Sequence, residues 1–169
     1  ANIGYYTCLL AKLVGKDGKV FAFEPDPRNL KLLEKNVKVN EYNNVVIVDK
    51  AVSDVNGTCT LYCSQKKFGA STIFESEKTK TKDRFPVKSE TVSLDYYFKK
   101  LNLHNKIDFI KIDIEGGEID VINYFINNNF KLTIFLEVHP WHIKNHFNGS
   151  TEELIELLFD NYNNIEFNR

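Results

Sequence analysis

The sequence of 169 residues has no methionine and only three cysteines. An odd, small number of cysteines cannot form a disulfide framework, so we expect a reducing, cytoplasmic setting. No apolar run is long enough to cross a bilayer, and no transmembrane helix is expected. Because the chain lacks methionine and starts with Ala1, we also expect that residues precede it in the intact protein. A targeting segment could be among them.

The chain also lacks an excess of charge of either sign. Its 22 basic and 23 acidic residues give a formal net charge of -1. A nucleic-acid partner is therefore not expected, because no large basic field is available to attract phosphates. Hydrophobic residues make up 43% and charged residues 27% of the chain. These values are typical of a globular protein, and the length suits a single domain with a sizeable core.

Strand and helix signals alternate along most of the chain. Apolar runs predict strands over 19–23, 45–48, 107–112 and 132–138, with a further strand beginning at 165. Apolar residues at helical spacing predict helices over 5–13, 27–37, 94–101, 118–126 and 151–158. Asp26, Ser93 and Ser150 are the predicted N-caps of three of these helices.

The middle of the chain has a different pattern. The stretch Ala51–Cys63 predicts a β-hairpin with Asn56-Gly57 as its turn. The stretch 64–90 has the least pattern, and its part 75–84 is almost wholly polar and charged. We interpret it as a solvated excursion from the fold, with a loop over a substrate as the alternative.

Apolar strands separated by helices predict an open, mostly parallel sheet with helices on both faces. This is an α/β fold of the Rossmann-like kind. Ligands of such sheets bind beyond the carboxyl ends of the strands. The residues that follow each predicted strand are therefore the candidate site.

Three of these residues have the chemistry of a nucleotide site. Gly4 precedes the first helix, where glycine lets a ligand approach backbone N–H groups. Glu24 ends the 19–23 strand, and a carboxylate there can accept hydrogen bonds from the ribose hydroxyls of an adenosine. A solvent-exposed acid is the alternative. Ala51 follows the 45–48 strand, where its small side chain leaves room for a flat ring. The alternative is that Ala51 is an ordinary loop residue.

Two further groups follow the later strands. Asp113, Glu115 and Glu118 lie in one tight turn and helix start, together with two glycines. Capping explains at least one of these acids, but a structural turn does not need all three. Glu137 and His139 lie two residues apart, so alternation places them on the same side of the chain. Histidine suits general-base chemistry, although a lone histidine is more often structural.

In combination these residues resemble the FkbM-type methyltransferases, class I enzymes that use S-adenosylmethionine. The resemblance runs in family order over nearly the whole chain. It rests on Ala1-Asn2-Ile3-Gly4-Tyr5-Tyr6-Thr7, Val20-Phe21-Ala22-Phe23-Glu24-Pro25, Lys50-Ala51-Val52-Ser53-Asp54 with Asn56-Gly57, Ser93-Leu94-Asp95, Asp108-Phe109-Ile110-Lys111-Ile112-Asp113-Ile114-Glu115-Gly116-Gly117-Glu118 and Leu136-Glu137-Val138-His139-Pro140.

The resemblance implies a seven-stranded sheet and transfer of a methyl group to a hydroxyl oxygen of a small metabolite, sugar or lipid-linked glycan. It assigns Asn2 and Gly4 to the methionine side of the cofactor loop and Glu24 to the ribose. Asp113 and Glu115 match the acidic turn beside the methyl group. The family's first strand and its last strands are missing, so we expect one methyltransferase domain over 1–169, truncated at both ends.

The expected chemistry is an in-line displacement in which a base removes the hydroxyl proton. Asp113 and His139 are the candidate bases, with Glu115 and Glu137 orienting them or the substrate. A divalent metal on the carboxylates is an alternative way to lower the pKa of the hydroxyl, although no metal ligands are assigned. The Asn/Asp-Pro-Pro-Tyr/Phe turn of many amino-methylating enzymes and a Pro-Cys nucleophile for cytosine are both absent from the sequence, which favours an oxygen acceptor.

Two other interpretations remain open. A nicotinamide-dependent Rossmann oxidoreductase also uses a glycine loop and a strand-end acid, but it needs Gly-x-Gly-x-x-Gly and has no use for clustered carboxylates. A catalytically inert, methyltransferase-like binding module would keep the fold without the reaction. Cofactor binding separates these interpretations.

Overall fold

The computed structural model describes residues 1–66, 71–73, 83–104, 106–114, 118–146 and 150–166. The chain divides into two compact units, Ala1–Tyr96 and Tyr97–Arg169, and each is described by itself. Helix α3 (Leu94–Leu101) contains the boundary between them. The prediction of a single domain over the whole chain stays a prediction.

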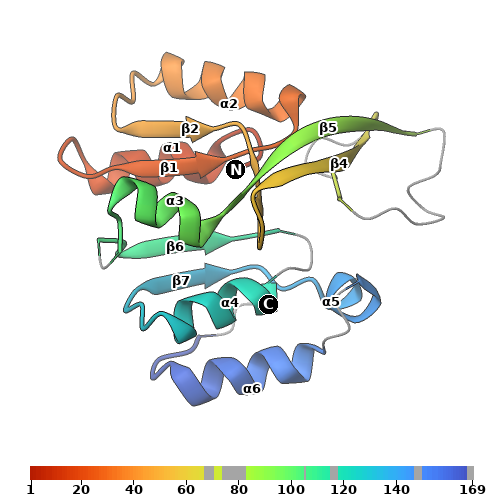
Figure 1. The fold of residues 1–169 in the computed structure, drawn as a ribbon. Coiled ribbons are helices and arrows are strands. Elements are labelled where there is room, and N and C mark those ends of the chain that lie inside the picture. Colours follow the sequence, from red (N-terminus) through yellow and green to blue (C-terminus); the bar gives the residue numbers. More distant parts are fainter. Residues whose placement is uncertain (67–70, 74–82, 105, 115–117, 147–149, 167–169) are drawn as a thin grey trace. The chain divides into compact units, whose positions relative to one another are not determined.

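The first unit begins with the predicted alternation of helices and strands. It contains α1 (Tyr5–Val14), β1 (Val20–Phe23), α2 (Pro27–Val39) and β2 (Val45–Val48). Strands β1 and β2 pair in parallel and run in the same direction in Figure 1. Their register places Phe23 opposite Val48, so both strands end at the same edge. The prediction of two short parallel strands separated by a helix is confirmed here.

The predicted hairpin over Ala51–Cys63 is wrong. Strands β3 (Ala51–Ser53) and β4 (Gly57–Ser64) do not pair with each other, because β5 (Arg84–Ser93) lies between them. β5 pairs in parallel with β3 and in antiparallel with β4. The interpretation of the whole 64–90 stretch as a solvated excursion is wrong for its last part, which belongs to β5. Residues 67–70 and 74–82 lie outside the described residues.

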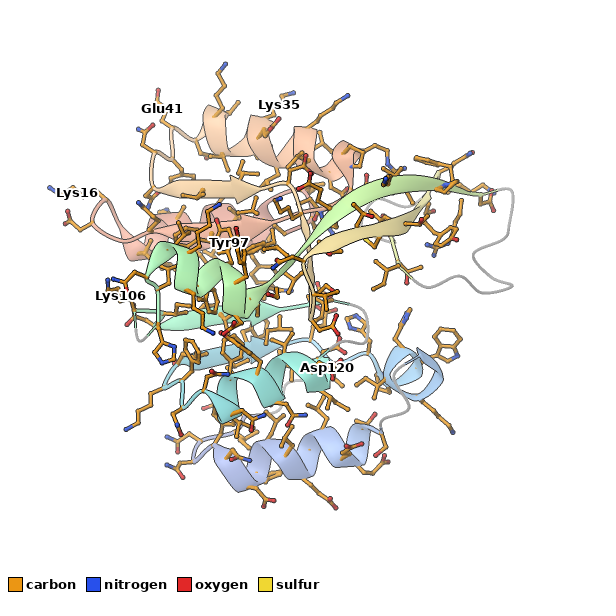
Figure 2. The ribbon with its side chains drawn as sticks, in the orientation of Figure 1. Lys16, Lys35, Glu41, Tyr97, Lys106 and Asp120 are labelled. Carbon is orange, nitrogen blue, oxygen red and sulfur yellow. The ribbon has the colours of Figure 1, made fainter. Side chains whose placement is uncertain are left out.

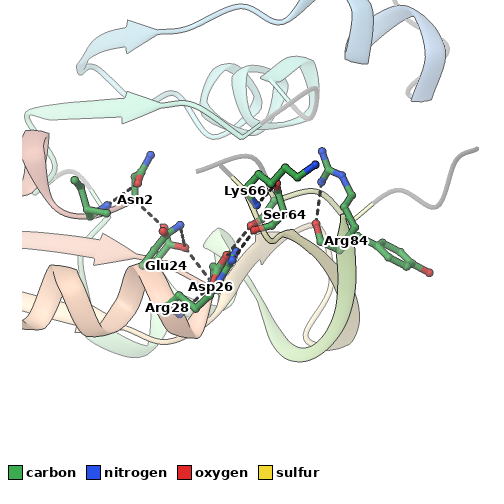
Figure 3. Close-up of polar contacts among 11 residues, drawn as sticks. Asn2, Glu24, Asp26, Arg28, Ser64, Lys66 and Arg84 are labelled. Carbon is green, nitrogen blue, oxygen red and sulfur yellow. Dashed lines mark hydrogen bonds and ion pairs between the residues drawn. The ribbon is translucent and has the colours of Figure 1, made fainter. Parts of the chain in front are cut away.

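Helix α2 begins as predicted, and its first turn holds an ion pair with a buried carboxylate. The Asp26 carboxylate accepts a hydrogen bond from the Arg28 backbone N–H at 2.9 Å, which makes Asp26 the N-cap. The same carboxylate pairs with the Arg28 guanidinium at 2.7 Å and is fully buried. Arg28 also donates to the Ser64 carbonyl at the end of β4 (Figure 3). Ser71 Oγ donates to Asp26 at 2.7 Å. These contacts tie the start of α2 to the end of β4.

The second unit repeats the parallel arrangement. It contains β6 (Phe109–Ile112), α4 (Glu118–Asn127), β7 (Thr133–Leu136), α5 (Pro140–His146) and α6 (Thr151–Asn161). β6 and β7 pair in parallel, with Ile112 opposite Leu136. Four aromatic rings from α3, α4 and the turn after α4 pack together with centroids 5.3–6.4 Å apart. These rings belong to Phe98, Tyr124, Phe125 and Phe130.

The other local predictions can be compared with the structure directly. Ser93 Oγ accepts a hydrogen bond from the Tyr96 N–H at 3.3 Å, and Ser150 caps α6. These two predicted caps are confirmed. The strand expected from Ile165 is wrong for the described residues, because Ile165 and Glu166 are in no strand.

Lys35 on α2 and Asp120 on α4, labelled in Figure 2, are exposed charged residues of these helices. Among the residues that the structure describes, every helix is too short or too polar to cross a bilayer. The fold is therefore of the mixed α/β class, with two parallel strand pairs and one mixed three-stranded sheet. A continuous Rossmann-like sheet with helices on both faces stays a prediction.

Replacing Asp26 with Asn tests the ion pair at the start of α2. Burial alone would raise the pKa of Asp26, but the hydrogen bonds from Arg28 and Ser71 hold it well below its ordinary value. Asparagine still caps a helix, so Asp26→Asn removes the charge and keeps the cap. We expect a loss of roughly 1.5–3 kcal/mol in the free energy of unfolding at pH 7, measured by urea denaturation.

The pH dependence of this loss has a definite sign. A carboxyl whose pKa is lowered in the folded state stabilises the protein above its unfolded value, about 3.9 for aspartate, and loses that contribution as the pH falls. The difference in the free energy of unfolding between wild type and Asp26→Asn therefore becomes smaller below about pH 4. Asp17→Asn, at an exposed acid, serves as the control and should leave stability unchanged. An equal loss in both variants would contradict the role of the ion pair.

Candidate active site

The predicted cofactor residues of the first unit meet at the end of β1. Glu24 follows β1 directly and is only 5% exposed. Its Oε2 accepts a hydrogen bond from the Asn2 backbone N–H at 2.6 Å and lies 3.2 Å from the Ala1 nitrogen (Figure 3). Its Oε1 accepts from the Asp26 N–H at 2.9 Å and from Asn29 Nδ2 at 3.3 Å. Glu24 is therefore a buried acid that holds the loop before α1, and the alternative of an exposed strand-end acid is wrong.

The loop before α1 has the tight backbone that its glycine predicts. Asn2 and Gly4 both have positive φ angles, 54° and 95°. The Gly4 N–H donates to the Ala1 carbonyl at 3.2 Å, which closes the turn. A Cβ on Gly4 would lie 2.7 Å from the Cδ1 atom of Leu33, a fully buried residue of α2. Both the backbone angle and the close packing against α2 require glycine at this position.

Ala51 lies near this corner but is not an open loop residue. It is the first residue of β3, pairs with Thr91 and is 7% exposed. The Glu24 N–H donates to the Val48 carbonyl at 3.1 Å, so the ends of β1 and β2 are adjacent. A surface depression of about 320 Å³ opens beside these ends, lined by Pro25, Pro27, Asp49 and residues 87–90. Ala51 itself does not line this depression.

The second unit brings three of its predicted residues together. Ile112 is opposite Leu136, so Asp113 and Glu137 follow at the same edge, and the Glu137 N–H donates to the Ile112 carbonyl at 2.9 Å. Single ligand atoms of Asp113, Glu137 and His139 all lie within 4.8 Å of one another. His139 Nε2 is 3.7 Å from Asp113 Oδ1 and 3.9 Å from Glu137 Oε1, which are ion-pair separations rather than hydrogen bonds.

Two residues that were given no role in the sequence analysis complete this group. The Lys111 ammonium lies 3.0 Å from Asp113 Oδ2 and 3.7 Å from Glu137 Oε2. The Glu118 carboxylate, fully buried at the start of α4, lies 3.0 Å from His139 Nδ1. We call Lys111, Asp113, Glu118, Glu137 and His139 the strand-end cluster. It joins three carboxylates, one ammonium and one imidazole.

The cluster has an exposed side and a buried side. The side chains of Asp113 and Glu137 are 38% and 56% exposed, whereas His139 is 20% and Glu118 0% exposed. Negative charge exceeds positive charge when His139 is neutral, so the cluster stabilises an imidazolium once the ring has taken a proton. This arrangement suits a residue that accepts a proton from a bound hydroxyl group.

A metal ion has the right donor types here, because two carboxylates and one imidazole converge. The ammonium of Lys111, however, already places a positive charge beside both exposed carboxylates. The cluster therefore has an internal cation that balances part of its charge, and we assign no metal to it.

The structure thus divides the sequence-predicted residues into two groups. Asn2, Gly4 and Glu24 come together in the first unit, with Ala51 buried nearby. Asp113, Glu137 and His139 come together in the second unit. Glu115, predicted in the acidic turn, lies outside the described residues.

Sequence reasoning missed the roles of two residues in the strand-end cluster. Lys111 gave a usable signal, because a lysine in the apolar strand β6 needs a partner. Glu118 was grouped with the acidic turn, but an acid at a helix start is ordinary, and nothing in the sequence pairs it with His139.

Comparisons with known proteins identify a relationship over almost the whole chain. Residues 1–165 match the family described as the methyltransferase FkbM domain. A curated relative, methyltransferase sdnD of Sordaria araneosa, is 27% identical to this chain, and the alignment covers 83% of the chain. The alignment covers 64% of that relative, so the chain spans less than two thirds of its length. No solved structure matches the chain.

Replacing Glu24 with Gln tests how the loop before α1 is held. Glu24 accepts N–H donors on both oxygens, and a glutamine side chain would turn an NH₂ group toward one set of them. We expect the Asn2 and Asp26 amides to exchange hydrogen at least about tenfold faster, measured by hydrogen exchange. Glu34→Gln, at an exposed position of α2, should leave both rates unchanged. Equal rates in wild type and Glu24→Gln would show that the loop does not depend on Glu24.

Proposed function

The chain belongs to the FkbM methyltransferase family, and on that premise we propose that it transfers a methyl group from S-adenosylmethionine to a hydroxyl oxygen. The family match over residues 1–165 carries the proposal, and the printed name of the curated relative agrees with it. We propose a small metabolite, a sugar or a lipid-linked glycan as the acceptor, in line with the resemblance and with the motifs absent from the sequence.

The residues of the first unit include an acceptor that suits this cofactor. Glu24 is a carboxylate at the end of β1, suited to ribose hydroxyls, and it holds the glycine turn at Asn2 and Gly4 beside it. The four nitrogen donors on Glu24 mean that a ribose hydroxyl must compete with one of them. The 3.2 Å contact with the Ala1 nitrogen is among the longest. When bound, the cofactor supplies an electrophilic methyl group on a sulfonium.

The depression beside β1 and β2 is the proposed place for the adenine ring. Pro25 and Pro27 contribute apolar surface to it, and Asp49 contributes a hydrogen-bond acceptor. Ala51 was the residue predicted for this role. Its burial at the start of β3 makes it a support of this corner, while Pro25 and Asp49 offer the contact surface.

In the second unit, His139 is the proposed base. Asp113 is engaged with the Lys111 ammonium at 3.0 Å, which suits it to hold the acceptor or the imidazolium. His139 turns Nε2 toward the exposed side of the strand-end cluster, where Asp113 and Glu137 lie. The proton of the acceptor hydroxyl passes to Nε2, and the electron pair of the broken O–H bond stays on the oxygen. General-base assistance of this kind contributes about 10²–10⁴ in rate.

Cofactor binding is the direct test of the family function. Titration calorimetry with S-adenosylmethionine should give saturable binding, and Glu24→Gln should weaken it at least about tenfold through the loss of charged hydrogen bonds. Glu34→Gln is the matched control and should bind as wild type does. NAD, titrated in the same way, should not bind.

Each other result contradicts the proposal in a recognisable way. Binding of NAD in place of S-adenosylmethionine would support the nicotinamide-dependent oxidoreductase. Absence of binding by a protein that unfolds cooperatively would support the inert module. Binding that Glu24→Gln leaves unaltered would remove Glu24 from the ribose site.

Turnover tests the base. With S-adenosylmethionine carrying a labelled methyl group and a panel of sugars and hydroxylated metabolites, His139→Gln should lower the rate by about 10²–10⁴ at unchanged cofactor affinity. Asp113→Asn should lower it less, since its role is to hold charge. His104→Gln, at an exposed histidine of the same unit, is the control and should retain full activity. Unchanged turnover in both His139→Gln and Asp113→Asn would refute the base assignment.

A further inference from the structure

The two nitrogens of His139 have different surroundings. Nδ1 lies 3.0 Å from the Glu118 Oε1 atom, within hydrogen-bond distance and on the fully buried side of the strand-end cluster. Nε2 lies 3.7 Å from Asp113 and 3.9 Å from Glu137, the two exposed carboxylates. The ring therefore has an inner nitrogen bonded to a buried acid and an outer nitrogen turned toward accessible groups.

The position of Glu118 is fixed by the fold. It is the first residue of α4, whose Ile122 and Phe125 are fully buried. Phe125 packs against Phe98 and Phe130, with ring centroids 6.4 and 5.3 Å apart. A carboxylate on a helix anchored in this way is held in one place, and His139 meets it from the segment after β7.

Helix stabilisation alone would not explain this geometry. An acid in the first turn interacts favourably with the helix dipole wherever its side chain points, and Asp120 does so from an exposed position on the same helix. Glu118 instead turns inward, where a carboxylate is costly unless it has a hydrogen-bond donor. The His139 ring lies at that place.

We propose that Glu118 is the positioning residue of the base: it holds His139 in the tautomer that carries its proton on Nδ1 and leaves Nε2 to take the proton of the acceptor hydroxyl. The proposal deepens the methyl-transfer function and rests on it for the identity of the reaction. An ionised carboxylate only accepts hydrogen bonds, so a Glu118 in this state requires the proton on Nδ1. A carboxylate behind an imidazole fixes tautomer and orientation in this way in other general-base pairs.

Other charged groups also face the ring, and they act on its charge rather than on its tautomer. Asp113 after β6, Glu137 after β7 and His142 of α5 lie around it, and the His142 ring centroid is 6.1 Å away. Lys111 of β6 pairs with both Asp113 and Glu137. Of these described groups, Asp113 and Glu137 lie nearest to the outer nitrogen and beyond hydrogen-bond distance. A test of Glu118 must therefore read the tautomer itself.

Nitrogen NMR of protein labelled with ¹⁵N-histidine reads the tautomer without any ligand. At a pH where His139 is neutral, the wild-type ring should show a protonated Nδ1 and an unprotonated Nε2, assigned by comparison with His139→Gln. Glu118→Gln keeps the size of the side chain but offers an NH₂ group as well as an oxygen, so it should give a mixture of tautomers. Asp120→Asn removes a first-turn acid from the same helix and should leave the wild-type pattern (Figure 2).

Turnover adds the functional readout. Glu118→Gln should lower kcat about tenfold or more, with the KM for the acceptor and the affinity for S-adenosylmethionine unchanged. In the His139→Gln background the same change should have no further effect, because the residue acts through the ring.

Three results would overturn the proposal. The first is a protonated Nε2 in the wild type, which would make Glu118 the hydrogen-bond donor. The second is the same tautomer in wild type and Glu118→Gln. The third is an equal loss of kcat in Glu118→Gln and Asp120→Asn. The wild-type spectrum, assigned with His139→Gln, decides the first even if Glu118→Gln does not fold. Suppose that neither the wild type nor any variant transfers methyl groups, while Glu118→Gln shifts the tautomer as expected. The methyl-transfer proposal then fails, but the contact by which Glu118 positions His139 is supported.

Discussion

In each unit, parallel pairing aligns the last residues of two strands that are distant in the sequence. Phe23 lies opposite Val48 in one pair and Ile112 opposite Leu136 in the other. Parallel strands end at the same edge of a sheet, so the polar residues that follow them are brought together without any further interaction. Glu24 owes its place to the first pair and Asp113 and Glu137 owe theirs to the second. The arrangement of the strand-end residues in both units follows from this register.

Two buried carboxylates both need hydrogen-bond donors, but their donors give them different roles. Asp26 and Glu118 are both fully buried, and each needs a donor to offset the cost of leaving water. Asp26 has the Arg28 guanidinium at 2.7 Å, a group that keeps its charge at any ordinary pH. That pair can only hold structure, and it joins α2 to β4. Glu118 has an imidazole, whose second nitrogen can gain and lose a proton near neutral pH.

The sequence predicted the local features of the fold well. Local features depend on residues that are close in the sequence, and a sequence pattern describes such residues directly. Examples are the strands over 20–23 and 45–48 and the caps Asp26, Ser93 and Ser150. The loop before α1 belongs to the same class, because a glycine before a helix permits the positive φ angle that this turn needs. For this reason Gly4 and Glu24 could be grouped from their spacing before their contact was seen, and the family resemblance added Asn2.

Features set by distant parts of the chain could not be predicted in this way. The Asn56-Gly57 pair indicates that the chain changes direction, but it does not determine which strand pairs with β3 and β4. That place is taken by β5, which begins some twenty residues after β4 ends, and its hydrogen bonds replace those of the predicted hairpin. Glu118 illustrates the same limit at the site. Its sequence context is that of any helix-capping acid, and only the packing of α4 turns it inward to His139. Residue type and spacing therefore identify groups that can do chemistry, whereas tertiary packing decides which nitrogen of a histidine is left to do it.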